Sequence, residues 1–354
     1  MLLILSCLSA SAQEVSQDEV DPRELRRFWI STLTNTKALL VAPYTLTQKE
    51  RDKYAGVFGV DLSHYSFDIS TSDSCGTPSG YLDPECSCRA NWDKLASNGI
   101  VYVYSKASDG DDTDLSFPRF WSEMAPRHAA KSMFRGAYHF LRPSIDAKTQ
   151  AKAFLTAIGA TNGQRPDQLP PALDIEWSNK RISPGTPAYE NCPANRRTRN
   201  DRGNYYCDMW YTKSPGEIVQ LAKEWISLVS AATGRSVVIY TNPTAWWNPV
   251  MGSVGDGLAK ANAIWTSRYT GAGPAYDPRW TKQGGSPQWR MAPLPHGASY
   301  PTAKYTIGHF WQFSENGTLP EVFTCNGKPE TRSMDMNWLP INKADYEVVF
   351  GVSN

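Results

Sequence analysis

Apolar runs rich in β-branched and aromatic residues recur along the chain from Val57 onward, as expected for strands. They lie at residues 57–64, 100–108, 133–141, 170–177, 236–242, 263–270, 306–314 and 333–339. Residues 91–98, 115–131, 146–160 and 214–233 carry apolar side chains at helical spacing, whereas later connections are rich in Pro, Gly and Trp. This alternation predicts one α/β domain, a (β/α)-barrel of eight strands with helices mainly in its first half, roughly (β/α)5(β)3.

Three segments do not fit this alternation of strand-like and helix-like segments. Residues 13–53 are polar, compatible with helix and without a strand pattern, so we expect an N-terminal extension at 13–55 and the barrel at 56–345. Residues 68–90 and 178–213 are polar insertions, which we expect to decorate one rim of the barrel.

The first residues resemble an export signal. A short apolar run ends in Ala10-Ser11-Ala12, a small-residue pattern typical of signal-peptidase sites, so residues 1–12 are interpreted as a signal peptide. Lipoprotein anchoring through Cys7 is the less favoured alternative, because the apolar stretch before it is short. No other segment approaches the length of a membrane span. The sequence therefore predicts a secreted or periplasmic protein without stable membrane insertion.

Cysteine usage agrees with export. Removal of residues 1–12 leaves six cysteines, an even number that suggests disulfides. They are Cys75, Cys86, Cys88, Cys192, Cys207 and Cys325. Cys192 and Cys207 bracket the second insertion and could close it, while the other pairings stay open. Cys86 and Cys88 are too close for a usual zinc pair and no matching His cluster follows, so no metal site is expected.

Charge and aromatic content narrow the partners. The formal net charge of +1 gives no electrostatic case for nucleic acid. A basic cluster at Arg196, Arg197, Arg199 and Arg202 is followed at once by acidic and aromatic residues, so we interpret it as a solvated loop rather than a binding patch. The thirteen Trp residues can stack on sugars, although most are expected to be ordinary core residues.

Polar or aromatic residues stand near the ends of nearly all the predicted strands, where barrels of this type carry their active sites. They are Asp61, Lys106 with Asp109, Tyr138 with His139, Asp174 with Glu176, Tyr240, Tyr269, Gln312 and Asp335. Among the basic residues, His139 is interpreted as packed and hydrogen-bonded, and Lys106 as the partner of a carboxylate. For His64, which lies near the end of the first strand, a structural role is favoured and a substrate contact is the alternative. Several acids converging on one mouth favour a catalytic site.

Asp174 and Glu176 form the central acidic pair. Residues two apart on a strand point to the same face, so both carboxyl groups face the mouth while Leu173 and Ile175 face the helices. Two such acids can divide glycosidic cleavage between them, since one donates a proton to the leaving oxygen and the other stabilises positive charge.

The ordered set of motifs resembles glycoside hydrolase family 25, the N,O-diacetylmuramidase type of lysozyme, over roughly residues 56–340. The motifs are Gly59-Val60-Asp61-Leu62-Ser63, Lys106-Ala107-Ser108-Asp109-Gly110, Gly136-Ala137-Tyr138-His139-Phe140, Asp174-Ile175-Glu176, Ile239-Tyr240-Thr241, Trp265 with Tyr269, Trp311-Gln312-Phe313 and Asp335-Met336-Asn337. Three departures stand out: Asp109 occupies a position where the family usually has Glu, both insertions are unusually long, and residues 13–40 and 41–56 have no counterpart in the family.

The resemblance implies hydrolysis of the β-1,4 bond between N-acetylmuramic acid and N-acetylglucosamine in bacterial peptidoglycan, with retention and without a cofactor. It implies that Glu176 is the general acid, that Asp174 assists a covalent or substrate-assisted step, and that Asp61 and Asp335 line the pocket. Residues expected to shape the sugar subsite or its rim are Tyr138, Tyr240, Trp265, Tyr269, Gln312, Lys106 and Asp109.

Competing interpretations differ in what the site does. A hydrolase of another N-acetylated glycan such as chitin is disfavoured, because Pro170-Pro171-Ala172-Leu173 stands where chitinase-type barrels carry additional acids. A non-catalytic glycan-binding or interaction protein has no need for crowded carboxylates. A zinc amidase lacks a ligand set, given five His in the chain. The biological purpose and any immunity or inhibitor protein stay open.

Overall fold

The computed structural model describes residues 44–45, 56–67, 88–130, 132–160, 168–269, 310–325 and 327–339. The segments predicted as signal peptide (1–12) and most of the extension (13–55) lie outside these residues. The same holds for Cys7, Cys75, Cys86 and most of the first insertion.

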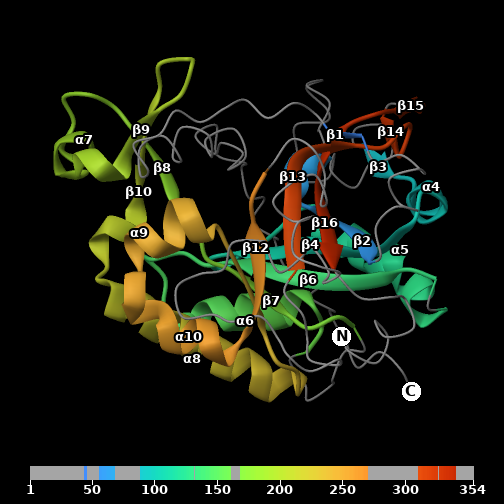
Figure 1. Cartoon of the computed structure of the whole chain (residues 1–354), viewed down its shortest axis with the longest axis horizontal. Coiled ribbons are helices and arrows are strands. Elements are labelled where there is room, and N and C mark those ends of the chain that lie inside the picture. The colour runs from blue at the N-terminus through green and yellow to red at the C-terminus, as the bar shows by residue number, and fades with distance from the viewer. Residues whose placement is uncertain are drawn as a thin grey trace, which may run out of the picture.

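Eight strands form a closed barrel, as the hydrophobic pattern predicts (Figure 1). In order around the barrel they are β2 (Val57–Leu62), β4 (Ile100–Asp109), β6 (Phe134–Phe140), β7 (Ala172–Asp174), β11 (Val238–Thr241), β12 (Ala263–Ser267), β13 (Phe310–Thr318) and β16 (Ser333–Leu339). Closure comes from β16, which pairs with both β13 and β2.

The last strand runs against its neighbours. The strands from β2 to β13 pair in parallel, whereas β16 is antiparallel to both β13 and β2. Its connection to β13 is short and carries only the hairpin β14 (Phe323–Cys325) and β15 (Lys328–Glu330). Parallel strands need a longer crossover, usually a helix, so this link returns the chain in the opposite direction.

Helices follow the first strands, close to the predicted ranges. They are α4 (Trp92–Ser97), α5 (Phe117–Ala129), α6 (Ala147–Ala157) and α8 (Pro215–Thr233). The Ser214 and Glu217 side chains form a capping box at the start of α8, and Gly234 adopts a left-handed conformation (φ 68°) at its end. Helices α6 and α8 pack against each other outside the barrel (Figure 1). After β11 the chain forms only short helical pieces: η4 (Pro243–Trp247), α9 (Asn248–Val250), η5 (Gly252–Gly255) and α10 (Asp256–Ala261).

Two apolar clusters lie on the two sides of the barrel wall. The larger one packs the outer faces of the strands against the helices. The smaller one fills the interior with large rings, including Tyr102, Tyr104 and Trp265. Gly59 and Gly136 make room for these rings, because a Cβ atom at either position would lie 2.2 Å and 2.4 Å from the Tyr102 and Tyr104 rings, respectively. The interior is therefore a packed core and not a pore.

The second insertion forms a separate lobe after β7. It contains a three-stranded antiparallel sheet of β8 (Asn179–Ile182), β10 (Tyr205–Asp208) and β9 (Arg197–Arg199), with α7 (Pro187–Asn191), η2 (Ala194–Arg196) and η3 (Met209–Thr212). The expected Cys192–Cys207 disulfide is present. The interpretation of the arginine cluster as a solvated loop is wrong at Arg197 and Arg199, because both lie in a strand paired along its length with β10.

Several smaller elements lie outside both the eight barrel strands and the lobe. Strand β3 (Arg89–Ala90) extends the β14–β15 hairpin, and a Cys88–Cys325 disulfide joins the two segments. Strand β1 (Tyr44–Thr45) pairs with the end of β13, so the expectation that residues 13–53 contain no strand is wrong at these two positions. Strand β5 (Asp112–Thr113) folds back on β4, and η1 (His64–Ser66) follows β2. Among the described residues, no helix combines the length and apolarity that crossing a bilayer requires.

Candidate active site

A hydrogen-bond network surrounds the Asp61 carboxylate at the end of β2. The Gln312 side-chain amide donates to Asp61 Oδ2 at 2.8 Å, and the Asn337 amide donates to the same oxygen at 2.7 Å. Asp61 is buried, and these two donors fix the orientation of its carboxylate.

Aromatic side chains complete the network. The hydroxyl groups of Tyr240 and Tyr269 donate to Gln312 Oε1 at 2.8 Å and 2.6 Å. The Trp265 indole donates to Asn337 Oδ1 at 2.8 Å. A carboxylate only accepts and an indole N–H only donates. The Gln312 and Asn337 side chains must therefore point their NH2 groups at Asp61 and their oxygens at the aromatic donors, as observed. The network thus brings together five residues singled out from the sequence: Asp61, Tyr240, Trp265, Tyr269 and Gln312.

Asn337 is a member of this network that the sequence analysis did not select as a site residue. It stands two positions after Asp335 on β16, and alternation along a strand puts both on one face. Extending the alternation from Asp335 would have identified it.

Asp335 reaches the mouth by a different route from the one expected. It lies near the beginning of β16, not at its carboxyl end, and it pairs directly with Asp61 of β2. The antiparallel direction of β16 brings the start of this strand to the edge at which the parallel strands end.

Tyr138 lies where the acidic residues converge. Burial raises the pKa of its phenol well above the usual value. Nearby carboxylates raise the same pKa further, and they belong to Asp61, Asp174, Asp114 and Asp335. Acids of three different strands, together with Asp114, therefore lie within electrostatic range of one phenol at the mouth.

Asp174 and Glu176 extend the same wall. Leu173, Ile175 and Trp177 belong to the outer apolar cluster, so Asp174, the last residue of β7, faces the barrel interior, and Glu176 follows two residues later in a bend. Both acids are buried. The backbone is held by the Ile175 N–H, which donates to the Tyr240 carbonyl at 2.9 Å.

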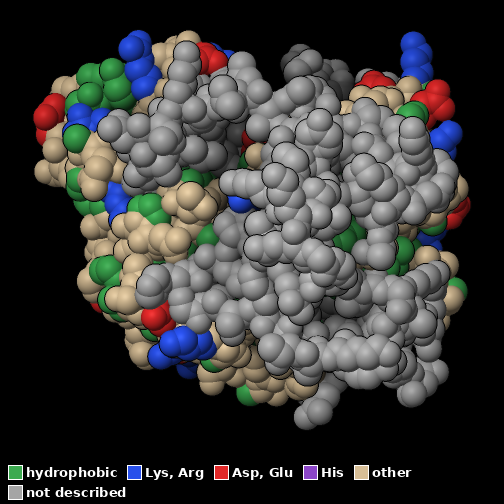
Figure 2. Space-filling view, in the orientation of Figure 1, with side chains coloured by type: hydrophobic (Ala, Val, Ile, Leu, Met, Phe, Trp, Pro, Cys, Tyr) green, Lys and Arg blue, Asp and Glu red, His purple; other side chains and the backbone are tan. Residues whose placement is uncertain are grey.

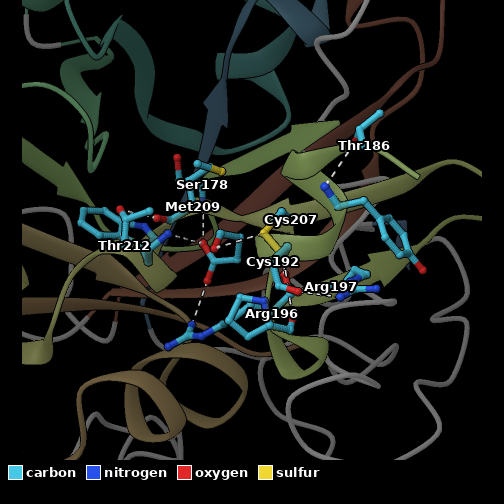
Figure 3. The surroundings of a disulfide bond; sticks show 12 residues. Ser178, Thr186, Cys192, Arg196, Arg197, Cys207, Met209 and Thr212 are labelled. Atoms are coloured by element: carbon cyan, nitrogen blue, oxygen red, sulfur yellow. Dashed lines mark hydrogen bonds and ion pairs between the residues drawn. A yellow bond between two sulfur atoms is a disulfide. The ribbon is translucent and has the colours of Figure 1, made fainter. Parts of the chain in front are cut away.

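Residues of the lobe form hydrogen bonds with the backbone near Glu176. The Trp210 indole donates to the Glu176 carbonyl at 2.7 Å. Asp208 is fully buried and accepts from the Ser178 N–H at 3.0 Å, while the Met209 N–H donates to the Ser178 carbonyl at 2.8 Å. These contacts join the base of the insertion to the segment that carries Glu176 (Figure 3).

The Asp208 carboxylate accepts hydrogen bonds from several segments at the base of the lobe. Burial raises the pKa of its carboxyl group, and the Arg196 guanidinium, 2.9 Å from Oδ2, opposes that rise. The Trp246 indole also donates to Oδ2, at 3.2 Å. A buried carboxylate with these donors holds several segments together.

Lys106 and Asp109 form a second charged group at the rim. Lys106 Nζ lies 3.3 Å from Asp109 Oδ2, which confirms the expected pairing of this lysine with a carboxylate. Arg142 binds both oxygens of Asp109 and contacts Ser178 Oγ at 3.3 Å. Burial raises the pKa of Asp109, but the charges of Arg142 and Lys106 outweigh it and hold the pKa well below its usual range. Asp109 is thus a structural anion within an ion-pair group.

Two histidines have structural partners. His139 is fully buried, with Nδ1 2.8 Å from Ser108 Oγ and Nε2 3.0 Å from Gln150 Oε1, and its ring stacks on Trp225. Burial lowers its pKa to about 4. The interpretation of His139 as a packed residue is confirmed. His64 lies after β2 with Nδ1 2.6 Å from Asp114 Oδ2.

A metal site needs several His, Cys, Asp or Glu side chains close together. Within the described residues, the one group with suitable spacing is Cys88, Cys325 and Glu330. Its two sulfur atoms are bonded to each other, so this group offers no pair of thiolate ligands.

The closed eight-stranded barrel with acids gathered at one mouth defines the class of protein, a (β/α)-type barrel. The sequence model of Glycosyl hydrolases family 25 matches residues 85–322, about two thirds of the chain. The chain therefore belongs to glycosyl hydrolases family 25.

Individual relatives agree with this assignment. Lysozyme M1 of Streptomyces globisporus is 25% identical over 268 residues, which cover 76% of this chain and 65% of that protein. An uncharacterized protein of Escherichia coli K12, YegX, is 25% identical over 159 residues, 43% of this chain and 44% of its own length. The chain thus spans less than two thirds of either relative. The crystal structure of a bacterial lysozyme from Streptomyces coelicolor has the same fold, with a TM-score of 0.50 and 23% identity over 84% of this chain and 99% of that one.

Proposed function

We propose that this protein is an exported lysozyme that hydrolyses the β-1,4 bond between N-acetylmuramic acid and N-acetylglucosamine in bacterial peptidoglycan. Family membership and the named lysozyme relative support the choice of reaction. The observation that carries the proposal is the convergence of Asp61, Asp174 and Asp335 around Tyr138, with Glu176 two residues beyond Asp174 on the same wall.

Glu176 is the proposed general acid. Its carboxyl group donates a proton to the glycosidic oxygen as the bond to the leaving sugar breaks. The backbone contacts from Trp210 and Ile175 hold its segment in place, and a held acid needs little reorganisation before it transfers a proton.

Asp174 is the proposed stabiliser of the positive charge that develops on the sugar or on its 2-acetamido group. Its carboxylate stands on the strand next to Tyr240 and faces the same interior. Asp61 and Asp335 line the pocket beside it, where they bind sugar hydroxyl groups or water.

The aromatic network forms the proposed floor of the sugar subsite. Tyr240 and Tyr269 are held by Gln312, and Trp265 is held by Asn337, so the rings have fixed orientations before substrate arrives. Fixed rings and hydrogen-bonding groups favour a distorted sugar ring in the transition state. The scheme uses carboxyl groups alone and needs no metal or organic cofactor.

Export is part of the proposal. The two disulfides, Cys88–Cys325 and Cys192–Cys207, are typical of proteins that fold in an oxidising compartment, and the small-residue pattern at Ala10–Ala12 supports the same location.

The test is digestion of purified peptidoglycan followed by borohydride reduction and mass spectrometry of the fragments. Wild-type protein should produce reduced muramic acid ends, and Glu176→Gln should lose them by at least a hundredfold. Glu224→Gln, the same change at an exposed position of α8, should behave as the wild type. Reduced glucosamine ends would contradict the bond assignment. Binding to the sacculus without cleavage by any of the three proteins would favour a non-catalytic glycan-binding role.

A further inference from the structure

One face of the lobe sheet carries a row of cations. Cys207 of β10 lies between Lys180 of β8 and Arg197 of β9, and two residues away Tyr205 lies between Ile182 and Arg199. Residues in register and two apart share a face, so Lys180, Arg197 and Arg199 lie on the same side. Lys180 and Arg199 are exposed.

Tyrosine rings hold the guanidinium groups of this face. The Arg197 guanidinium lies 3.9 Å from the centre of the Tyr189 ring, and the Arg199 guanidinium lies 5.3 Å from the centre of the Tyr205 ring. The two rings meet edge to face at 5.1 Å. Arg197 also donates to the Cys192 carbonyl at 2.6 Å. The two guanidinium groups are therefore positioned before any ligand binds, which reduces the entropy lost on binding.

The lobe is strongly positive while the rest of the chain is not. Residues 178–213 contain seven basic and three acidic residues, a net charge of +4 in a chain of net +1, which leaves −3 for the remainder. One of the three acids, Asp208, is buried against Arg196. Figure 2 shows basic, hydrophobic and a few acidic side chains over this lobe, at the upper left.

The position of the lobe relates it to the mouth of the barrel. It begins two residues after Glu176, and the Trp210 and Asp208 contacts fix its base to that segment. The lobe is held together by the Cys192–Cys207 disulfide (Figure 3) and by a small apolar core of Ile182 with both cysteines. The base of the lobe is therefore joined directly to the segment that carries the proposed acid.

We propose that the cations of this face, Lys180, Arg197 and Arg199 with Tyr189 and Tyr205, which surround the buried Ile182 and Cys207 side chains, bind the carboxylate groups of the peptide stems of peptidoglycan. The inference rests on the proposed function, because the stems are attached to the muramic acid residues of the strand that is cut. A guanidinium matches a carboxylate in shape and charge, and Arg side chains held on aromatic rings keep donors available. The stems are favoured over other wall anions because each glycan strand in the cleft carries them at regular intervals.

The experiment measures co-sedimentation with sacculi from which teichoic acids have been removed, using proteins in the Glu176→Gln background so that the polymer stays intact. Arg199→Gln should weaken binding about tenfold, and Lys180→Gln combined with it should weaken binding further. Arg181→Gln is the matched control. Arg181 is also exposed, but it pairs with Tyr206 and so lies on the opposite face of the same sheet.

Three comparisons decide the outcome: sacculi with and without stems, ordinary and raised salt, and sacculi with and without teichoic acids. On sacculi whose stems have been removed by an amidase, the Arg199→Gln protein should bind as well as its parent, and raised salt should abolish the difference on intact stems. Equal binding by Arg199→Gln and Arg181→Gln on stem-bearing sacculi would overturn the inference, as would an unchanged difference after the stems are removed. A difference seen only when teichoic acids are retained would assign the face to phosphate polymers instead.

A separate assay distinguishes this inference from the proposed function. It measures cleavage of stem-free glycan strands by the wild-type protein, in which Glu176 is intact. Cleavage without any effect of Arg199→Gln on binding rejects the inference alone. Stem-dependent binding without cleavage rejects the hydrolase and keeps the binding face.

Discussion

Asp61 of β2 and Asp335 of β16 are paired directly across the antiparallel seam that closes the barrel. Two carboxyl groups side by side repel each other when both are ionised. The Gln312 and Asn337 amides offset this cost at Asp61, since both donate to one of its oxygens. The first and last strands of the barrel therefore meet at the candidate site, and the amide network belongs to this seam as much as to the proposed sugar pocket.

Asn337→Asp should inactivate the protein at neutral pH and restore part of the activity in acid. The substitution replaces a donor to Asp61 with a second carboxyl group 2.7 Å away, but it keeps the acceptor for the Trp265 indole. At lower pH the two carboxyl groups share a proton, which supplies an O–H donor again. The measurement is the pH dependence of peptidoglycan digestion. Asn337→Leu is the comparison, since it cannot regain a donor; a parallel loss in both variants at every pH would contradict the role given to Asn337.

Gly59→Ala should destabilise the barrel by roughly 1–3 kcal/mol or more, because the new methyl group overlaps the buried Tyr102 ring. Urea unfolding gives the free energy of unfolding. Combination with Tyr102→Val should recover part of the loss. Gly216→Ala, in the first turn of α8 with nothing within 4 Å of the added Cβ, should be neutral or stabilising. Equal effects at Gly59 and Gly216 would show that the interior is loosely packed.

His139 should make stability fall as the pH is lowered from 6.5 to about 4. Burial holds the pKa of the native side chain at about 4, whereas the unfolded chain has the ordinary value near 6.5. In this window the unfolded chain binds the proton and the native protein does not, so acid favours unfolding, by about 3 kcal/mol at pH 4.

The test for His139 is the free energy of unfolding measured between pH 7 and pH 4. His139→Asn should be less stable at pH 7 but should lose less on acidification, so its curve approaches that of the wild type. Ser108→Ala retains the imidazole and should keep the wild-type slope. Parallel curves for wild type and His139→Asn would refute this assignment.

Asp208→Ala should lower both stability and activity although Asp208 lies outside the mouth. The change leaves Arg196 without its carboxylate and frees the Ser178 N–H, at a cost of roughly 3 kcal/mol. Digestion assayed at a temperature at which the variant remains folded should still be slower, because the Glu176 segment is less firmly held. Trp210→Phe should reproduce the activity loss with a smaller stability loss. Asp201→Ala, an exposed acid of the same lobe, is the control, and full activity in Asp208→Ala would separate the lobe from the proposed acid.

Local patterns in the sequence were sufficient for the strands and for most of the network. The alternation around Asp174 gives its direction because Leu173 and Ile175 are apolar, and the structure has both in the outer cluster. The direction of β16 was not predicted, since apolar periodicity is the same for a strand read either way and only the short hairpin link decides it.

The partners that hold the site were harder to identify from sequence. Arg142 and Asp109 are 33 positions apart, and Asp208 and Ser178 are 30 apart. Neither pair has a local spacing that marks it, because the contacts form only after the barrel closes and the lobe folds back. The same reason explains why Arg197 and Arg199 resemble a loop in sequence, since β9 is ordered only by β8 and β10, each of which is four residues long.

The Cys88–Cys325 disulfide makes the chain between these residues a covalent ring, 237 positions around, with β2 and β16 as parts of its two tails. Asp61 and Asp335 stand on opposite tails and meet only because the tails pair with each other. A protease that cuts once inside the ring leaves all eight strands in a single covalent molecule. Such a nick would therefore be tolerated while the disulfide stays oxidised, which suits the proposed export of the protein, and reducing conditions would remove this tolerance.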